Sequence, residues 1–278
     1  MAIASRTFDG GIGHEDYFDV GGGESAHIAF DPDNPRLVYA TTINGTLTEY
    51  DHENKRLRPI KPYPEYVYGQ QSRDLKYRTN WNAPVVASPH DPRMLYYGTQ
   101  KLLRSSDRGV TWEEISPDLT RNEKDKQGLN GGPLTPENVG AEFYGTIFYV
   151  TESPHEPGTI WVGSDDGLLH LTRDDGVSWE EVTPGDLEGA QINAIEISPH
   201  DAGTVYIVLE SEPEAPGNCG PEGCVVADLL TGAQIEVVEC FAYLHDAKRT
   251  NDGSDPGHGR RGAALARELQ GSMLRLAD

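Results

Sequence analysis

The sequence is poor in basic residues, and it has no long apolar run. Its 278 residues include 23 Lys and Arg against 45 Asp and Glu, which gives a net charge of −22. This charge argues against a nucleic-acid partner, because little would neutralise the phosphates. No run approaches the ~20 apolar residues of a membrane span, so we expect no transmembrane segment. The opening residues, MAIASRTFDGGIGHEDY, lack the charged and apolar regions of a signal peptide.

Cysteine is confined to the last quarter of the chain, at Cys219, Cys224 and Cys240. Cys219 and Cys224 could pair, but one such pair does not fix the redox compartment. The histidines show no metal-ligand spacing, and there is no phosphate loop, catalytic-cysteine motif or nucleophilic-serine motif. We therefore expect no metal and no cofactor.

Glycine and proline are plentiful, at 31 and 19 residues, which suits many short strands joined by tight turns. One pattern recurs four times, as DPDNPRLVYAT, SPHDPRMLYYG, SPHEPGTIWVG and SPHDAGTVYIV, starting at Asp31, Ser88, Ser153 and Ser198. The shortest spacing, between the last two copies, lies in the ~40–50 residue range of one four-stranded propeller blade. The longer spacings indicate insertions at the same point of the repeat.

Two repeats continue into the pattern [ST]-x-D-x-G-x-[ST]-W, called the Asp box. Its residues are Ser105, Asp107, Gly109, Thr111 and Trp112 in one copy and Thr172, Asp174, Gly176, Ser178 and Trp179 in the other. The Asp carboxylate can accept backbone N–H groups of its own turn, glycine permits positive φ, and Trp can pack against a neighbouring blade. The two copies predict an all-β fold, a β-propeller with four-stranded blades.

The repeats also predict how the chain is divided. We expect an outer strand of a preceding blade within 1–26 (at 16–20), blades at 27–60, 83–116 and 145–183, a partial blade at 192–242, and an irregular tail at 243–278 with a short helix over 263–276. About 3.5 to 4 blades suit an incomplete propeller, since rings usually close with roughly four to eight. We expect a fragment of a larger propeller. The alternative is a small ring that the strand at 16–20 completes.

Residues 15–209 resemble a family of large bacterial proteins with sortilin-type Asp-box propellers, also described as BNR-repeat or glycosyl-hydrolase-like. Besides the Asp boxes, the resemblance rests on VGGGES, DLKYRTNWNAP, SPDLTRN and FYGTIF, which begin at Val20, Asp74, Ser116 and Phe143. It implies an exported protein. Relatives with this repeat include peptide-binding sortilin ectodomains, xyloglucanases that cleave glucans with paired carboxylates, and sialidases, so the repeat does not select a function.

The four strands of a blade are lettered A to D in sequence order, from the inner strand to the outer one. The resemblance implies that ligands bind on the ring face that carries the loops from strand D to the next strand A and from B to C, opposite the Asp boxes. Both insertions, 61–82 and 117–144, are D–A loops, and long loops on a rigid scaffold often carry function. A glycosidase needs two carboxylates about 5–5.5 or 6.5–9.5 Å apart. The candidate catalytic residues are Asp74, Glu142, Asp165 and Asp166, and the candidate ligand-binding residues are Arg73, Arg78, Trp81, Asn82 and Tyr144.

Each candidate also has a purely structural explanation. Asp165 and Asp166 stand in a Ser-Asp-Asp-Gly turn, where aspartate commonly forms the turn itself. Asp74 and Glu142 could be solvated or ion-paired, and Trp81 could pack beside an inner strand. The histidines of the SPH turns, His90, His155 and His200, would be spread around a ring instead of gathered at a metal.

Two functions stay open at this point. The first is a non-catalytic propeller for binding or scaffolding, with a peptide or glycan on the D–A loop face, because no convincing catalytic pair accompanies the repeat. The alternative is a xyloglucanase-like glycoside hydrolase or a degraded relative, suggested by the two long loops. A sialidase is disfavoured, because it needs three arginines and a tyrosine nucleophile, and no F/Y-R-I-P element occurs. A fragment without an independent function is the third possibility.

Overall fold

The computed structural model describes residues 2–3, 11–24, 27–31, 34–129, 139–141, 143–184, 190–210 and 224–228. Within these residues the chain is all-β, apart from short 3-10 helices η1 (His14–Asp16), η2 (Ile43–Gly45) and η3 (Ser72–Asp74). The predicted helix at 263–276 and parts of the predicted partial blade, 211–223 and 229–242, lie outside the described residues, as do Cys219 and Cys240.

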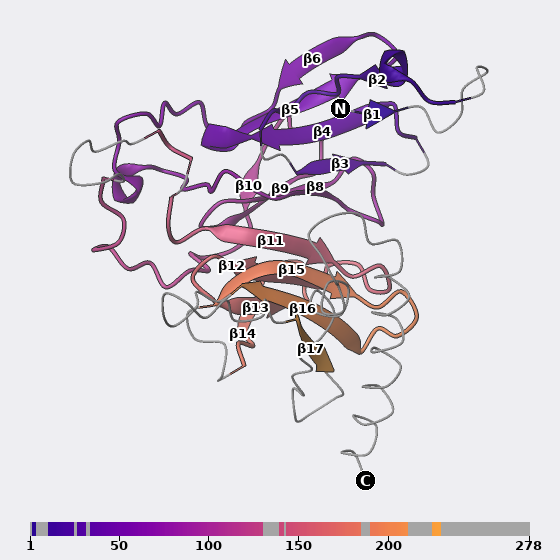
Figure 1. The fold of residues 1–278 in the computed structure, drawn as a ribbon. Coiled ribbons are helices and arrows are strands. Elements are labelled where there is room, and N and C mark those ends of the chain that lie inside the picture. Colours follow the sequence, from indigo (N-terminus) through magenta and orange to yellow (C-terminus); the bar gives the residue numbers. More distant parts are fainter. Residues whose placement is uncertain are drawn as a thin grey trace, which may run out of the picture.

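Four sheets follow one another along the chain (Figure 1). The first contains β3 (Ile28–Phe30), β4 (Leu37–Thr42), β5 (Thr46–Asp51) and β6 (Arg56–Pro59). The second contains β7 (Val85–Ala87), β8 (Leu95–Gly98), β9 (Leu102–Ser105) and β10 (Glu113–Glu114). The third contains β11 (Ile147–Glu152), β12 (Ile160–Ser164), β13 (Leu169–Thr172) and β14 (Glu180–Glu181). The fourth contains β15 (Gln191–Ile197), β16 (Thr204–Glu210) and β17 (Cys224–Asp228).

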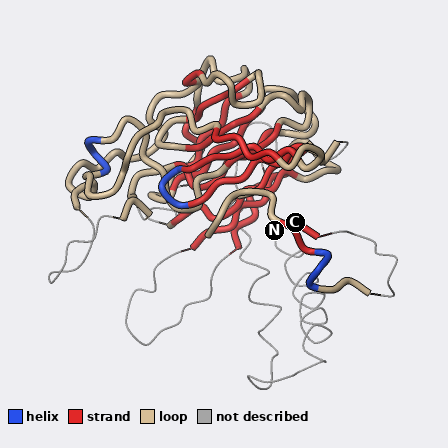
Figure 2. The backbone as a smooth tube through the Cα atoms, turned by 90° about the horizontal axis from the view of Figure 1, so that it is seen from above, coloured by secondary structure: helices blue, strands red, loops and turns tan. Residues whose placement is uncertain are grey.

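Each sheet is an antiparallel meander in which strands adjacent in sequence are also adjacent in space. The first strands of successive sheets contact one another, β3 with β7, β7 with β11 and β11 with β15. The sheets are therefore stacked as the blades of a propeller and fan out in sequence order (Figure 1). From above, the strands gather in the centre and the loops surround them (Figure 2). The predicted fold class, an incomplete all-β propeller, is confirmed.

Apolar cores fill the spaces between neighbouring blades. Tyr39 and Leu47 of the first blade pack with Leu95 of the second, and Leu102 of the second packs with Ile160 of the third. A further core joins the third and fourth blades. Because a middle blade is covered on both faces, its second strand is a continuous apolar run, LYYG or IWVGS, instead of an alternating one.

The Asp-box turns fold through hydrogen bonds to their aspartate. Asp107 Oδ1 accepts the N–H groups of Val110 (3.0 Å) and Thr111 (2.8 Å), and Oδ2 accepts the Thr111 hydroxyl at 2.7 Å. These bonds, led by that of the Thr111 hydroxyl, lower the pKa of Asp107 to about 2. Gly109 takes a φ of +75°, a region that glycine enters without a steric penalty. Asp174 accepts equivalent bonds from Ser178 in the second copy.

Two side chains repeatedly tie one blade to the next. The indole Nε1 of Trp112 donates to the Ile60 carbonyl at 2.9 Å, and Trp179 donates to Ile115 at 2.8 Å. At the SPH turns, Nε2 of His90 donates forward to the Ser153 carbonyl at 2.7 Å, and His155 makes the same bond to the next blade. His90 and His155 therefore join neighbouring blades by hydrogen bonds.

Two details differ from the strand boundaries expected from the sequence. From the sequence we expect outer strands over 111–116 and 177–183, but β10 and β14 are two residues long, because Thr111, Trp112 and their counterparts belong to the Asp-box turns. The segment 16–20 forms only a two-residue strand, β2 (Tyr17–Phe18), which pairs with β1 (Ala2–Ile3). Val20 is buried nonetheless.

Replacing Trp112 by Phe tests the tie between the first two blades. The variant keeps an aromatic ring but leaves the Ile60 carbonyl without its indole donor, so we expect a loss of about 1–3 kcal/mol in the free energy of unfolding. Urea denaturation measures it. Val110→Ala, at a side chain 66% exposed in the same turn, is the control and should change stability by less than about 0.5 kcal/mol. Equal midpoints for W112F and wild type would contradict the assignment.

Candidate functional site

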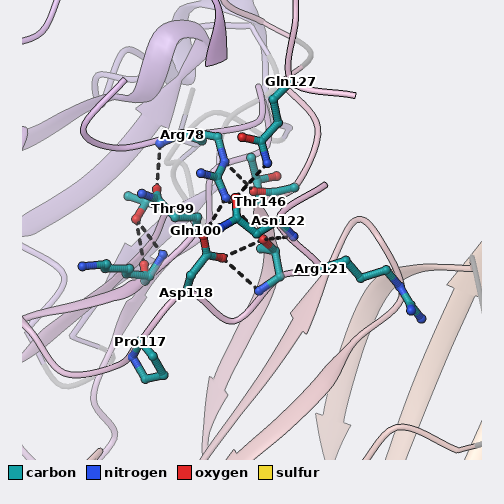
Figure 3. Close-up of polar contacts among 12 residues, drawn as sticks. Arg78, Thr99, Gln100, Pro117, Asp118, Arg121, Asn122, Gln127 and Thr146 are labelled. Atoms are coloured by element: carbon teal, nitrogen blue, oxygen red, sulfur yellow. Dashed lines mark hydrogen bonds and ion pairs between the residues drawn. The ribbon is translucent and has the colours of Figure 1, made fainter. Parts of the chain in front are cut away.

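A buried polar network lies where the two long D–A loops meet the B–C turns of the second and third blades (Figure 3). Its centre is Arg78, which is 3% exposed. Its Nε donates to the Gly145 carbonyl at 3.0 Å, and its Nη2 donates to Asp118 Oδ2 at 2.9 Å and to Thr120 Oγ1 at 3.3 Å. One arginine thus joins the end of the first loop to both ends of the second.

Gln100, in the B–C turn of the second blade, fixes the backbone beside Arg78. Its Oε1 accepts the Arg78 N–H at 2.8 Å, and its Nε2 donates to the Lys76 carbonyl at 2.9 Å. Both carboxylate oxygens of Asp118 accept hydrogen bonds. Oδ2 accepts from Arg78, and Oδ1 accepts the backbone N–H of Thr120 at 3.1 Å and the Thr120 hydroxyl at 2.6 Å. The network therefore satisfies its own donors and acceptors, as buried polar groups require.

Asp165 holds the chain just before β11. Its Oδ1 accepts the N–H groups of Gly145 (3.1 Å) and Thr146 (2.8 Å), and its Oδ2 accepts the Thr146 hydroxyl at 2.9 Å. Gly145 has a φ of +75°, so the chain turns sharply at this contact. Burial raises the pKa of Asp165 to about 7, although the bonds from Thr146 oppose the shift.

Asp166 performs a similar task on the second D–A loop. Its Oδ2 accepts the Arg121 N–H at 2.8 Å, and Ser164 Oγ donates to its Oδ1 at 2.6 Å. The Arg121 Nε donates back to the Asp166 carbonyl at 2.8 Å. Burial is also the main cause that raises the pKa of Asp166. Both aspartates therefore hold loop backbone, as turn residues do.

Tyr144 lies at the edge of the network. Its hydroxyl donates to the carboxylate of Glu123, and the ammonium of Lys126 stands 5.0 Å from the centre of its ring. Burial raises the pKa of Tyr144 to about 12, and the charge of Asp166 contributes. The structure thus brings four predicted residues together: Arg78, Tyr144, Asp165 and Asp166.

The other predicted residues lie apart from this network. Arg73 and Asp74 are exposed in or beside η3, and Trp81 and Asn82 are half-buried just before β7. Glu142 lies outside the described residues. Asp118 is a member that sequence reasoning missed. The Asp-Leu-Thr triplet at 118–120 could have identified it, because an aspartate in this pattern can accept hydrogen bonds from the backbone N–H and the hydroxyl of the threonine two residues later.

The first D–A loop also presents tyrosines to solvent. Tyr63, Tyr66 and Tyr68 are 41%, 71% and 44% exposed. The rings of Tyr66 and Tyr68 lie 5.2 Å apart, and Lys76 stands over the rings of Tyr63 and Tyr77 at 4.6 and 5.0 Å. Sequence reasoning missed Tyr63, Tyr66 and Tyr68, although the segment KPYPEYVY at 61–68 is visibly rich in tyrosine. These three tyrosines and Tyr77 are called the tyrosine platform below.

The described residues offer no cluster of three or more His, Cys, Asp or Glu able to hold a metal ion. In the same part of the chain, no helix is long and apolar enough to cross a membrane.

Comparison with known proteins adds a weak similarity to xyloglucanases. No family model matches the sequence. A probable oligoxyloglucan-reducing end-specific xyloglucanase from Neosartorya fischeri is 23% identical over 221 residues, and the enzyme of that name from Emericella nidulans is 25% identical over 199. The matches cover 74% and 67% of this chain but 24% and 22% of the relatives. The chain thus spans about a quarter of their length.

Solved structures of the same class are similar in a limited way. A GH74 xyloglucanase from Xanthomonas campestris has a TM-score of 0.48 at 20% identity, over 72% of this chain and 28% of its own. The GH74 enzyme of Niastella koreensis has a TM-score of 0.45 at 18% identity, over 73% and 28%. The glycosyl-hydrolase-like part of the predicted resemblance agrees with the two curated matches.

Replacing Arg78 by Met tests whether the network is structural. The variant keeps the apolar stem but leaves Asp118 without its buried counter-ion, so we expect a loss of about 3–5 kcal/mol in the free energy of unfolding. Arg73→Met, at an exposed position on the same loop, should change it by less than about 0.5 kcal/mol. Similar denaturation midpoints for the two variants would contradict the role of Arg78.

Replacing Asp165 by Asn tests the raised pKa. Stability contributed by a group whose pKa is raised in the folded protein is fully present below its unfolded pKa, 3.8 here, and is lost as the pH rises through about 7. We therefore expect the stability of the wild type, relative to D165N, to fall between about pH 4 and pH 8 in urea melts. A difference that stays constant or grows over this range would contradict the shift.

Proposed function

We propose that this chain is part of a glycan-binding propeller related to xyloglucanases, with the tyrosine platform as its sugar-binding surface. The observation that carries the proposal is the exposure of Tyr63, Tyr66 and Tyr68 on one long loop. A tyrosine ring offers a flat apolar face with a polar edge, which suits a sugar ring that is apolar on its faces and polar at its hydroxyls. Binding of a polysaccharide would also agree with the predicted export of the protein.

The carboxylates of the network support binding without catalysis. Both oxygens of Asp118, Asp165 and Asp166 accept hydrogen bonds from loop backbone or from neighbouring side chains. A general acid or base must instead reach the proton that it transfers, directly or through one water. The B–C turns of the first two blades contribute Ile43–Gly45 and Gln100–Lys101, without a carboxylate. The described loops therefore favour binding and scaffolding.

A xyloglucanase-like hydrolase is the second candidate, and the names of the curated relatives favour it. One observation in the structure supports it as well. Asp165, with a pKa of about 7, lies beside a second carboxylate, Asp166. A carboxyl that is still protonated near neutral pH can serve as the general acid of a glycosidase. In this second function Asp165 would donate the proton to the leaving sugar.

Binding of a xyloglucan oligosaccharide, measured by isothermal titration calorimetry, tests the proposed function. Tyr66→Ala removes the most exposed ring, and we expect affinity to fall about 3- to 10-fold, on the order of 1 kcal/mol. Tyr17→Ala is the control, because it also removes an exposed tyrosine ring but from β2, outside the loop that carries the platform. It should leave the affinity for the oligosaccharide unchanged. No binding by the wild type, or equal affinity of Y66A, would contradict the platform.

Release of reducing ends from xyloglucan separates the two functions. The binding function predicts no release above the blank, whereas the hydrolase predicts release that D165N abolishes while oligosaccharide affinity persists. Turnover lost in D165N would replace the first proposal by the second.

A further inference from the structure

A pocket of about 290 Å³ opens at the junction of the second and third blades, on the side of the Asp-box turns. The A–B turns of both blades and the Asp-box turn of the third line it. Its lining includes Asp91, Met94, Tyr96, Glu152, Gly158 and Asp175. This volume is at the lower limit of the ~300–1,000 Å³ of small-molecule sites, so the pocket suits a single side chain or a small ion.

Glu152, the last residue of β11, lines this pocket, and one oxygen of its carboxylate is buried without a hydrogen-bond partner. The residue is 6% exposed. Its Oε1 accepts the Gly158 N–H at 3.0 Å, whereas no described residue donates a hydrogen bond to its buried Oε2. The Tyr96 hydroxyl bonds Met94 Sδ at 3.2 Å and also lies close to Glu152; burial raises the pKa of Tyr96, and the Glu152 carboxylate adds to this effect. A buried carboxylate oxygen without a donor is costly, and the cost is removed by a bound donor.

The repeat shows that the propeller fold itself does not need this glutamate. The residue that precedes the repeat motif is Phe30 in the first blade, Ala87 in the second and Ile197 in the fourth. Only the third of these four described positions carries an ionisable side chain. The other carboxylates of the pocket are already paired, Asp91 with Arg93 and Asp175 with Arg104. Glu152 is therefore the acceptor that stays available.

We propose that this pocket binds a primary ammonium group, such as the lysine side chain of a partner protein. An ammonium carries three donors and a positive charge, so it can satisfy Oε2 of Glu152 and use the Tyr96 oxygen as a second acceptor. A divalent metal fits less well, since calcium takes six to eight oxygen ligands and the described residues gather no three metal-binding side chains here. The net charge of −22 attracts cationic partners to the protein as a whole.

The Gly158 amide reports on the site directly, because its N–H is bonded to the other oxygen of Glu152. We would titrate the ¹⁵N-labelled full chain with methylammonium and follow that amide signal by NMR. We expect a saturable shift with methylammonium. Tetramethylammonium, which has the same charge and no N–H donor, should cause none. A tripeptide with a central lysine should reproduce the shift, and its norleucine analogue should not.

Two variants test whether Glu152 is the group that binds methylammonium. Glu152→Gln should abolish the methylammonium shift, and Glu156→Gln, which removes an exposed carboxylate from the same turn, should retain it. A shift that persists in E152Q, or that tetramethylammonium matches, would overturn the proposal. So would a shift caused by potassium or calcium alone, which would assign a metal ion, or no saturable shift, which would leave only water at Oε2. If E152Q fails to fold, the comparison of the two ammonium ions on the wild type decides.

Discussion

Each middle blade of this structure buries apolar side chains on both of its faces, so it depends on a neighbour on each side. The close approach leaves no room at the second strands. A Cβ at Gly98 would stand 2.8 Å from the Ile147 side chain, and one at Gly163 would collide with Ile192. The indole bonds of Trp112 and Trp179 and the imidazole bonds of His90 and His155 then fix the register of the stacked blades. The rest of the molecule is arranged around this stacking.

The polar network follows from the same stacking. The two long loops cross the junction of the second and third blades, where their backbone groups are removed from water and need partners. Arg78, Asp165 and Asp166 supply those partners, which explains why charged side chains are buried there. Groups that resemble a catalytic set in sequence thus serve to hold loops in the structure. The first of these loops also displays the tyrosine platform, in which Tyr63, Tyr66 and Tyr68 keep much of their surface exposed.

The sequence predicted the features whose determinants are local or repeated. The aspartate of the Asp box finds its hydrogen-bond partners within four residues. The repeated motif likewise predicts the first two strands of every blade. The network was less accessible, because Arg78 meets Asp118 and Gly145 across 40 and 67 residues. No spacing rule reveals such a pair in a single sequence. The short outer strands were missed for another reason, since the Asp-box turn takes residues that have strand-like composition.

The side chains of Asp165 and Asp166 bind loop backbone and are therefore not free for a ligand. Hydrogen exchange of the amides of Gly145, Thr146 and Arg121 tests this binding most directly, because these three loop amides donate to the two carboxylates. We expect these amides to exchange as slowly as amides inside β11 and β12, since each opens only when the blade junction opens. Exchange at the rate of an unprotected loop would instead show that the two carboxylates are free to bind a ligand.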